Sequence, residues 1–431
     1  MAKTFREYSP DQLLLMAPSL REWLPEDHSV YFVSDLVETL DLSAIYGSYD
    51  EERGYPPYHP LLMTKLVVYG YTRGVRSSRK LARACLEAVD FRILAAGQQP
   101  DHRTIAAFRA RHLKALSGLF QQVLELCRAA GLVKLGHVAV DGTKVRANAS
   151  KHKAMSYARM KQEEARLQEK IRRWFEECEA TDAAEDALYG ADKTGDELPE
   201  ELRDPKRRLE KIREAKAALE AQARAKGKEE PEAKAQRNFT DPDSRIMLSS
   251  DKAFIQAYNC QATVDAGSQV IVAADVLQAS SDQRQLVPML EQTEERLGEK
   301  PKVVSADAGY WVEEDLDRTE AKGTEALVAP HKIRHSEWRD AKPPRGRIPK
   351  GLSRKELMAR KLRTKRGREE YGKRKTTVEP VFGQIKGPLD FRQFLLRGHE
   401  KVTGEWMLVC TASNILKLFR AGHRLPALRA A

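Results

Sequence analysis

Three acidic residues in three different local contexts are the residues of this chain best suited to chemistry. Asp141 lies inside the strand-like run HVAVDGTKVRA, Asp307 follows the short apolar strand KVVSA, and Glu379 opens a helical stretch with basic surroundings. A carboxylate near a core costs desolvation free energy and is tolerated there when it is paired or binds a metal. Three carboxylates that converge would bind two Mg²⁺ ions, which clamp the attacking and leaving oxygens of a phosphodiester. The sequence therefore predicts a metal-dependent nuclease or polynucleotidyl transferase.

Each of these residues also has a plainer interpretation. Asp141 can be a turn or cap residue, although it follows Val138-Ala139-Val140 in mid-strand, and Asp307 before Ala-Gly can be an ordinary turn residue. For Glu379 alone, a solvated surface charge is the favoured interpretation. The combination of the three carboxylates is what favours a site.

The composition fits a nucleic-acid substrate. The chain has 74 Lys+Arg against 63 Asp+Glu, a net charge of +11, and such a surplus attracts phosphate backbones. The alternative is a basic surface without a nucleic-acid partner. No signal peptide and no membrane-length apolar run is recognisable, so we expect a soluble intracellular protein. The scattered cysteines lack metal-ligand spacing and are expected to be reduced thiols: Cys85, Cys127, Cys178, Cys260 and Cys410.

Residues 1–130 are predicted to be helical. Helices are expected from Pro60, from Ser77 or Ser78, after Asp101, and over LSGLFQQVLELCRAAG. The helix after Asp101 carries arginines expected to point outward, in an arrangement like a helix-turn-helix. An ordinary helical bundle with solvated arginines is the equal alternative. The candidate DNA contacts on this helix are Arg103, Arg109 and Arg111.

From Leu135 onward, the spacing of apolar residues changes from that of helices to that of β-strands. HVAVDGTKVRANA is strand-like, AYNCQATVDA and QVIVAADVLQA predict a hairpin around Gly267, and SSDQRQLVPMLEQTEERLG predicts a capped helix before the strand that ends at Asp307. This order predicts an α/β fold with an RNase H-like core over residues 131–425. Charged residues 151–236 are predicted to form a helical hairpin or coiled-coil arm, and basic residues 332–370 a phosphate-binding loop plus helix.

Smaller expectations concern residues near the predicted site. Tyr310 and Trp311 either stack on a displaced base or belong to the core, the latter being favoured. Asn259 and Asp265 are expected to be turn or strand-surface groups. Lys386 lies seven residues, about two helical turns, after Glu379, so both are expected on one helix face.

Several sequence blocks resemble the DDE transposases of bacterial insertion sequences, in the branch with an RNase H-like catalytic domain and a helical N-terminal domain. The blocks span residues from about 10 to about 420: YHPLLMTKLVVYGYTRGVRSSRKLARA, PDHRTIAAFRARH, DPDSRIMLSSDKAFIQAYNCQATVD, VSADAGYW and VEPVFGQIKG. These transposases often carry a tyrosine and an arginine before the glutamate and a lysine seven residues after it. Tyr371, Arg374 and Lys386 resemble that set, but Arg374 is five residues before Glu379 where four is commonest, and Lys375 occupies the expected place.

The resemblance implies a function, a cofactor and partners. Asp141, Asp307 and Glu379 would be the catalytic metal ligands for two Mg²⁺ ions, with Mn²⁺ as a substitute, and Arg374 or Lys375 and Lys386 would contact DNA phosphates. The enzyme would bind the terminal inverted repeats of its element, cut the ends and join the 3′-hydroxyls to target DNA. Its partners would be double-stranded DNA and further copies of the chain, as a dimer or larger oligomer, in the bacterial cytoplasm and on the nucleoid.

Two other functions use the same features. A metal-dependent nuclease without strand transfer would need the same carboxylates. A non-catalytic DNA-binding protein derived from a transposase would retain the basic charge, although the presence of all three carboxylates argues against it.

Overall fold

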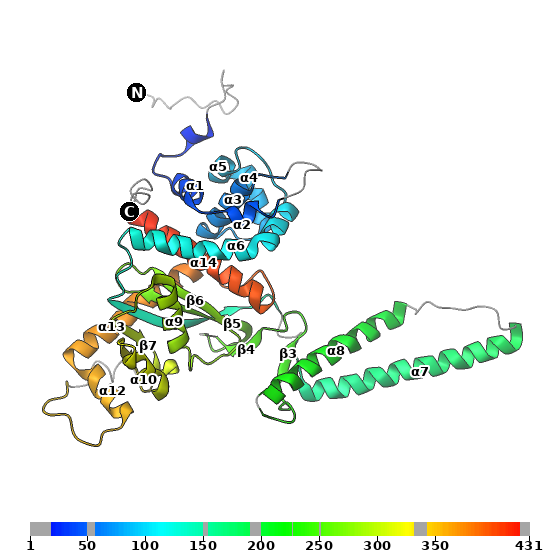
Figure 1. Ribbon diagram of the computed structural model, residues 1–431. Coiled ribbons are helices and arrows are strands. Elements are labelled where there is room, and N and C mark those ends of the chain that lie inside the picture. The colour runs from blue at the N-terminus through cyan, green and yellow to red at the C-terminus, as the bar shows by residue number, and fades with distance from the viewer. Residues whose placement is uncertain are drawn as a thin grey trace, which may run out of the picture. The chain divides into compact units, whose positions relative to one another are not determined.

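The structure, a computed structural model, describes residues 19–49, 57–149, 154–189, 200–225, 227–249, 251–331 and 343–422. The chain divides into two compact units, one of residues 1–132 with 411–431 and the other of residues 133–410. Their elements are labelled in Figure 1. The division at residues 132 and 133 falls where the apolar period changes from helical to strand-like.

The first unit is a set of helices around α3 (Pro60–Thr72), which is buried on almost every side. Pro60 begins this helix as predicted, because proline lacks only an N–H that has no partner in the first turn, and the His59 side chain accepts from Leu61 N. The other helices are η1 (Leu20–Trp23), α1 (Ser29–Thr39), α2 (Ser43–Tyr46), α4 (Ser78–Glu87), α5 (Val89–Leu94), α6 (His102–Ala129) and the last turns of α14 (His399–Arg420).

Helix α6 is continuous where the sequence predicts two helices. Asp101 caps it as expected, accepting from Arg103 N at 2.6 Å and Thr104 N at 3.3 Å. Leu116 and Leu119 are both buried, so the apolar stripe runs through the predicted break without interruption. Gly118 is tolerated inside the helix at a cost of about 1 kcal/mol.

The second unit contains a mixed sheet centred on β1 (His137–Arg146). On one side, β1 pairs antiparallel with β5 (Phe254–Asp265), which pairs antiparallel with β6 (Ile271–Leu277). On the other side, β1 pairs parallel with β7 (Val303–Ala306), and β7 pairs parallel with β8 (Glu325–Val328). A short strand, β4 (Arg245–Leu248), pairs with the start of β5. This strand order is RNase H-like and confirms the predicted α/β fold class.

The predicted β5–β6 hairpin is present, and its turn is held by Asp265. The Asp265 carboxylate accepts from Gly267 N at 2.8 Å and from Leu135 N at 2.8 Å. Of the two roles expected for Asp265, that of a turn residue is confirmed, and that of a strand-surface group is wrong because the side chain is buried. The sequence reasoning also missed β4, β8 and helix α10 (Glu313–Ala321), whose apolar runs are only a few residues long.

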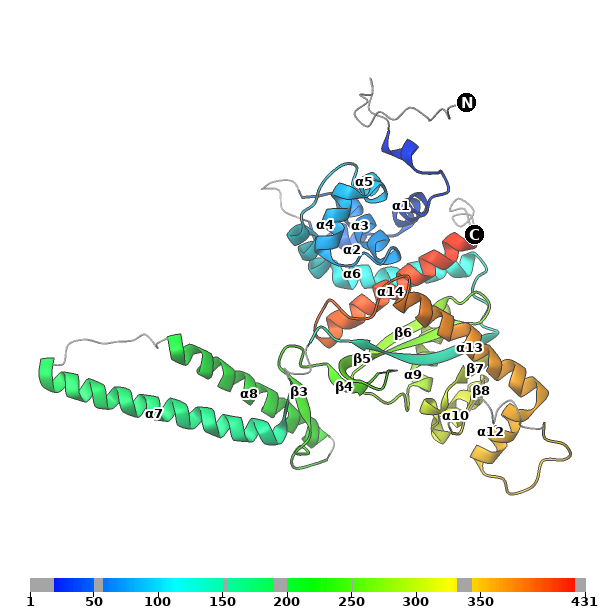
Figure 2. The same cartoon turned by 180° about the vertical axis from the view of Figure 1, so that it is seen from behind.

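Helices cover both faces of the sheet. Helix α9 (Leu286–Leu297) lies in front of the strands in Figure 1, and α13 (Lys365–Lys386) lies in front of them in the reverse view of Figure 2. The predicted basic insertion is partly described: residues 332–342 lie outside the described residues, and α12 (Arg354–Arg363) follows a loop. Its last residues, from Lys365 onward, are the start of α13 and not a separate insertion.

Two long helices, α7 (Tyr157–Tyr189) and α8 (Glu200–Ala225), pack together as in the predicted helical hairpin and are closed at their base by β2 (Ala154–Ser156) and β3 (Gln236–Asn238). We call this hairpin the arm. It has a small core of its own: Met155, Tyr157, Met160, Leu167, Leu209, Ile212, Ala215 and Leu219. Glu164 on α7 pairs with Arg213 at 3.1 Å and with Lys216 at 2.9 Å on α8, which fixes the pairing of the two helices.

Candidate active site

Asp141 and Asp307 are brought together by the central parallel strands. Val140 of β1 is in register with Ala306 of β7, so Asp141 and Asp307 are the next residues on two neighbouring strands. Asp307 ends its strand and caps a short 3-10 helix, η3 (Ala308–Tyr310), accepting from Gly309 N at 2.8 Å. The predicted pairing of these two carboxylates is therefore a property of the sheet register.

The environment of Asp141 makes its charge costly. Burial raises the pKa of Asp141 to about 6, the nearby Arg374 guanidinium opposes this rise, and the charges of Asp307 and Asp282 add to it. Arg374 Nη1 lies 3.0 Å from Asp141 Oδ2, and Gly142 N donates to Oδ1 at 2.8 Å. A buried carboxylate next to two further carboxylates favours a bound cation, and Arg374 supplies that positive charge in this structure.

The Glu379 side chain is exposed and is not part of a closed cage with the aspartates. It lies inside α13, which begins at Lys365, so it does not open the helix as the sequence suggested. Among the described residues, no three histidine, cysteine, aspartate or glutamate side chains form a ready metal-binding group. Two carboxylates suit Mg²⁺ all the same, because this ion usually binds one or two carboxylates and completes its shell with water and phosphate oxygens.

Pro380, immediately after Glu379, leaves the carbonyl of Thr376 without its helical donor. Gln269, in the turn of the β5–β6 hairpin, supplies a replacement, because its Nε2 donates to Thr376 O at 2.9 Å. The helix thus stays continuous through the proline, and the segment that carries Glu379 is tied to the hairpin.

The basic residues of α13 differ in their surroundings. Lys375 is exposed, whereas Lys386 is half-buried, and burial lowers the pKa of Lys386. Arg374 is 13% exposed and its guanidinium lies 5.9 Å from the centre of the Tyr371 ring. The expected phosphate contact of Arg374 is therefore replaced here by the ion pair with Asp141.

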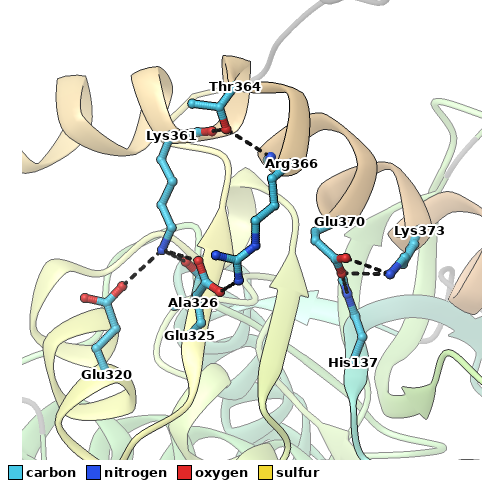
Figure 3. Close-up of polar contacts among 10 residues, drawn as sticks. His137, Glu320, Glu325, Ala326, Lys361, Thr364, Arg366, Glu370 and Lys373 are labelled. Atoms are coloured by element: carbon cyan, nitrogen blue, oxygen red, sulfur yellow. Dashed lines mark hydrogen bonds and ion pairs between the residues drawn. The ribbon is translucent and has the colours of Figure 1, made fainter. Parts of the chain in front are cut away.

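Hydrogen bonds and ion pairs anchor helix α13 to the sheet (Figure 3). His137 Nδ1 lies 2.8 Å from Glu370 Oε2. On its other side, His137 Nε2 lies 2.9 Å from Ser305 Oγ. Glu370 also pairs with Lys373 at 2.8 Å. On the neighbouring strand, Glu325 accepts from Lys361 and Arg366. These contacts fix the helix that brings Arg374 to Asp141.

The His137 contact predicts a loss of stability on acidification. Burial lowers the pKa of His137 below its ordinary 6.5, with Glu370 opposing the shift, and hydrogen bonds from Lys373 and His137 lower the pKa of Glu370. The unfolded chain therefore binds protons first, so the stability is fully present above about pH 6.5 and falls as the pH drops through the lowered pKa of His137. Thermal unfolding across this range should show a smaller acid loss for His137→Gln than for the unchanged chain. His102→Gln is the control, and equal losses in both variants would contradict the assignment.

One group of residues around the site was missed by the sequence reasoning. Asp282, in the loop between β6 and α9, accepts hydrogen bonds from Asn259 and Gln261 of β5. Both amide residues are fully buried, so the expectation of a surface role for Asn259 is wrong. Alternation along β5 was the available signal, because Asn259 and Gln261 begin a row of polar residues on one face of the strand that continues with Thr263 and Asp265.

The aromatic residues after Asp307 belong to the core. Tyr310 is fully buried, and Trp311 packs with Met358 and Leu362 of α12. The favoured interpretation of Tyr310 as a core residue is confirmed.

The three candidate arginines of α6 have different environments. Arg103 and Arg111 are exposed, although Arg111 donates to Ser48 O and lies over the Tyr49 ring. Arg109 is 7% exposed and donates to Arg76 O at 2.7 Å. Arg109 therefore stabilises the helical unit, and its expected outward orientation is wrong. The buried residues Ile105, Phe108 and His112 share its helix face, which explains the burial.

Comparison with protein families gives two matches. The family described as "Transposase domain (DUF772)" matches residues 18–111, and the family described as "Transposase DDE domain" matches residues 206–415. The second match includes Asp307 and Glu379 but begins after Asp141, whose place in the site rests on its position beside Asp307 in the sheet. Searches of curated proteins and of solved structures gave no significant match. No helix in the described part of the chain is long and apolar enough to cross a membrane. The two family matches and the RNase H-like sheet lead to one conclusion: the chain belongs to the insertion-sequence DDE transposases.

Proposed function

We propose that this transposase binds the terminal inverted repeats of its insertion sequence, cleaves at the element ends and joins the 3′-hydroxyl ends to target DNA by two-metal-ion phosphoryl transfer. DDE transposases generally use divalent metals and act on DNA. The observation that carries the proposal is the placement of Asp141 beside Asp307 at the centre of an RNase H-like sheet. The proposed setting is the cytoplasm, where the chromosome is accessible.

Asp141 and Asp307 are the proposed first two ligands of Mg²⁺, and Glu379 is the third. The donor set fits this ion, because it consists of carboxylate oxygens and the space beside it is kept open by glycine. A Cβ atom at Gly309 would lie 2.9 Å from Asp307 Oδ1. Held by these residues, Mg²⁺ would supply the chemistry that a two-metal site needs, namely activation of water or a 3′-hydroxyl and stabilisation of the leaving oxygen. Mn²⁺ is expected to substitute because it also prefers oxygen ligands.

The chain's own residues hold the DNA and balance the charge. Arg374 neutralises the Asp141 carboxylate in the structure, so we propose that it exchanges this partner for a DNA phosphate when the site is loaded. Lys375 and Lys386 on the same helix are proposed phosphate contacts. Arg103 and Arg111, which are exposed, are the proposed contacts of the helical unit with the inverted repeats.

Coordinated cutting of two element ends requires at least a dimer on DNA. The arm is our candidate for part of that contact, since two long helices joined by their own core and ion pairs can extend a stable surface. Sedimentation of the full chain with end-bearing DNA would test this proposal. A single copy per complex would contradict it.

The experiment for the function uses the full chain, Mg²⁺, DNA that carries the element ends and a supercoiled target plasmid. We expect joined products that depend on the end sequence, and a weaker preference for the ends when Arg103 and Arg111 are changed to Gln. Cleavage without joining identifies a nuclease and contradicts transposition. An unchanged preference in the double variant excludes these two arginines from recognition, and binding without cleavage supports a non-catalytic protein.

A further inference from the structure

A buried polar network connects the loop before α9 to the turn that carries Asp307. Asp282 Oδ1 accepts from Asn259 Nδ2 at 2.6 Å and from Gln261 Nε2 at 2.7 Å, and Lys144 Nζ lies 3.5 Å away. Gln261 Nε2 also donates to Asn259 Oδ1 at 3.1 Å. One carboxylate oxygen thus organises two amide side chains that have no access to water.

The network reaches the Asp307 turn through Tyr310. The Tyr310 hydroxyl donates to Gln261 Oε1, and its ring is fully buried. Tyr310 is the last residue of η3, the short helix that Asp307 caps with its own carboxylate. Because buried polar groups are costly to leave unpaired, breaking any one of these contacts disturbs the others.

The network also contacts the strand that carries Asp141. A Cβ atom at Gly142 would lie 2.4 Å from Gln261 Nε2 and 2.7 Å from Asp282 Oδ1, so any other residue after Asp141 would displace these side chains from their present positions. At Gly309, a Cβ atom would lie 2.9 Å from Asp307 Oδ1 and 3.4 Å from Asp282 Oδ2. Asp282 therefore fills the space between the residues that follow the two catalytic aspartates.

We propose that Asp282 is a positioning residue for the metal-binding aspartates: through Gln261 and Tyr310 it fixes the turn of Asp307 against the strand of Asp141. The inference rests on the proposed function, because it takes Asp141 and Asp307 as the metal ligands. Partners that orient metal ligands contribute to metal affinity, and their loss typically weakens it 10–100-fold. A residue that only stabilised the fold would change unfolding and leave metal affinity unaltered.

The test measures Mn²⁺ binding to the full chain without DNA, by electron paramagnetic resonance of the free ion, in parallel with thermal unfolding. We expect Asp282→Asn, which keeps the shape but removes the charge, to weaken Mn²⁺ binding by about tenfold, and Asp282→Ala to weaken it by up to about a hundredfold. Tyr310→Phe removes only the hydroxyl donor and should have an effect in the same direction. The concentration of Mg²⁺ needed for half-maximal cleavage should rise in these variants, while the rate at saturating Mg²⁺ stays closer to that of the unchanged enzyme.

The controls separate this inference from the proposed function. Asp275→Asn, on β6, changes a half-buried aspartate that accepts from the backbone of Val276 and should leave Mn²⁺ binding unchanged. If Asp141→Asn does not weaken Mn²⁺ binding, the ligand assignment of the proposed function fails. If Asp141→Asn weakens binding but the Asp282 and Tyr310 variants bind Mn²⁺ normally, the ligand assignment stands and the role of Asp282 is overturned. If Asp282→Ala is unfolded at the assay temperature, the Mn²⁺ affinities of Asp282→Asn and Tyr310→Phe decide whether Asp282 positions the metal ligands.

Discussion

Replacing Asp307 by Asn should abolish DNA cleavage and strand joining while leaving DNA binding largely intact. The substitution removes a charged metal ligand and almost no volume, and the backbone amide of Gly309 can still donate to the side-chain oxygen. Metal ions contribute several kcal/mol of transition-state stabilisation, and a loss of about 4 kcal/mol corresponds to a rate reduction of roughly a thousandfold. Asp141→Asn and Glu379→Gln should have the same effect on cleavage, as measured by the appearance of cut element ends in Mg²⁺.

Of the two aspartate variants, Asp307→Asn tests the metal-ligand role more specifically. Asp141→Asn also removes the ionic partner of Arg374, a cation that is 13% exposed, so this variant alters the surroundings of Arg374 as well as a metal ligand. Asp315→Asn, which changes a buried aspartate on α10, is the matched control and should cut normally. Near-normal Mg²⁺-dependent cutting by any one of the three variants would remove that residue from the set of ligands. For Glu379, whose side chain is exposed, this experiment is the decisive one.

Replacing Lys386 by Ala should slow cleavage of bound DNA by roughly tenfold to over a hundredfold, because one charge-assisted contact contributes about 1.5–3 kcal/mol. Lys386 is half-buried near the like charges of Arg392 and Lys144, with the carboxylate of Asp251 in the same region. A cation kept partly out of water next to other cations suits an anionic ligand, and a DNA phosphate is the ligand that a transposase supplies.

The measurement for Lys386 is the single-turnover cleavage rate on pre-bound DNA, together with Mn²⁺ affinity, which should not change. Lys386→Arg should restore the rate poorly, because a guanidinium is planar and broader than an ammonium group. Lys375→Ala changes an exposed lysine on the same helix and shows how much of the effect is general loss of charge. A wild-type cleavage rate for Lys386→Ala would mean that Lys386 is a solvated charge on the helix and makes no functional contact with DNA.

Strong local patterns allowed much of the fold to be predicted. Alternating apolar residues defined β1 and the β5–β6 hairpin, and Pro60 and Asp101 marked helix starts where the structure has them. The sequence predicts two helices that meet near Leu116, whereas the buried residues Leu116 and Leu119 continue one apolar stripe and α6 is a single helix. Short elements such as β8 have too few residues to show a period, so only sheet pairing reveals them.

The site residues that could be predicted from the sequence are those whose role shows in the residues directly around them. Asp141 follows the apolar residues Val138 to Val140 within β1, Asp307 follows the apolar strand β7, and strand register then makes the two aspartates neighbours. Arg109 could not be distinguished from Arg103 and Arg111, because the direction of each arginine depends on the helices packed around α6. Asp282 lies in a polar loop that reads like a helix cap, and its partners Asn259 and Gln261 are more than twenty residues away in the chain. Contacts over such separations are set by tertiary structure alone.

The insertion of the arm between β1 and β5 has a consequence for how the protein folds. These two strands are antiparallel neighbours in the sheet, yet residues 147–253 separate them in the chain. Relative to a short hairpin loop this is about four doublings of length, which adds roughly 2.5 kcal/mol of entropic cost to closing the pair. Because β2 and β3 pair at the base of the arm, the pairing of α7 with α8 holds the two ends of this segment close together. With the arm formed, the loop that has to close for β1 to pair with β5 is much shorter, and the entropic cost of the insertion falls accordingly.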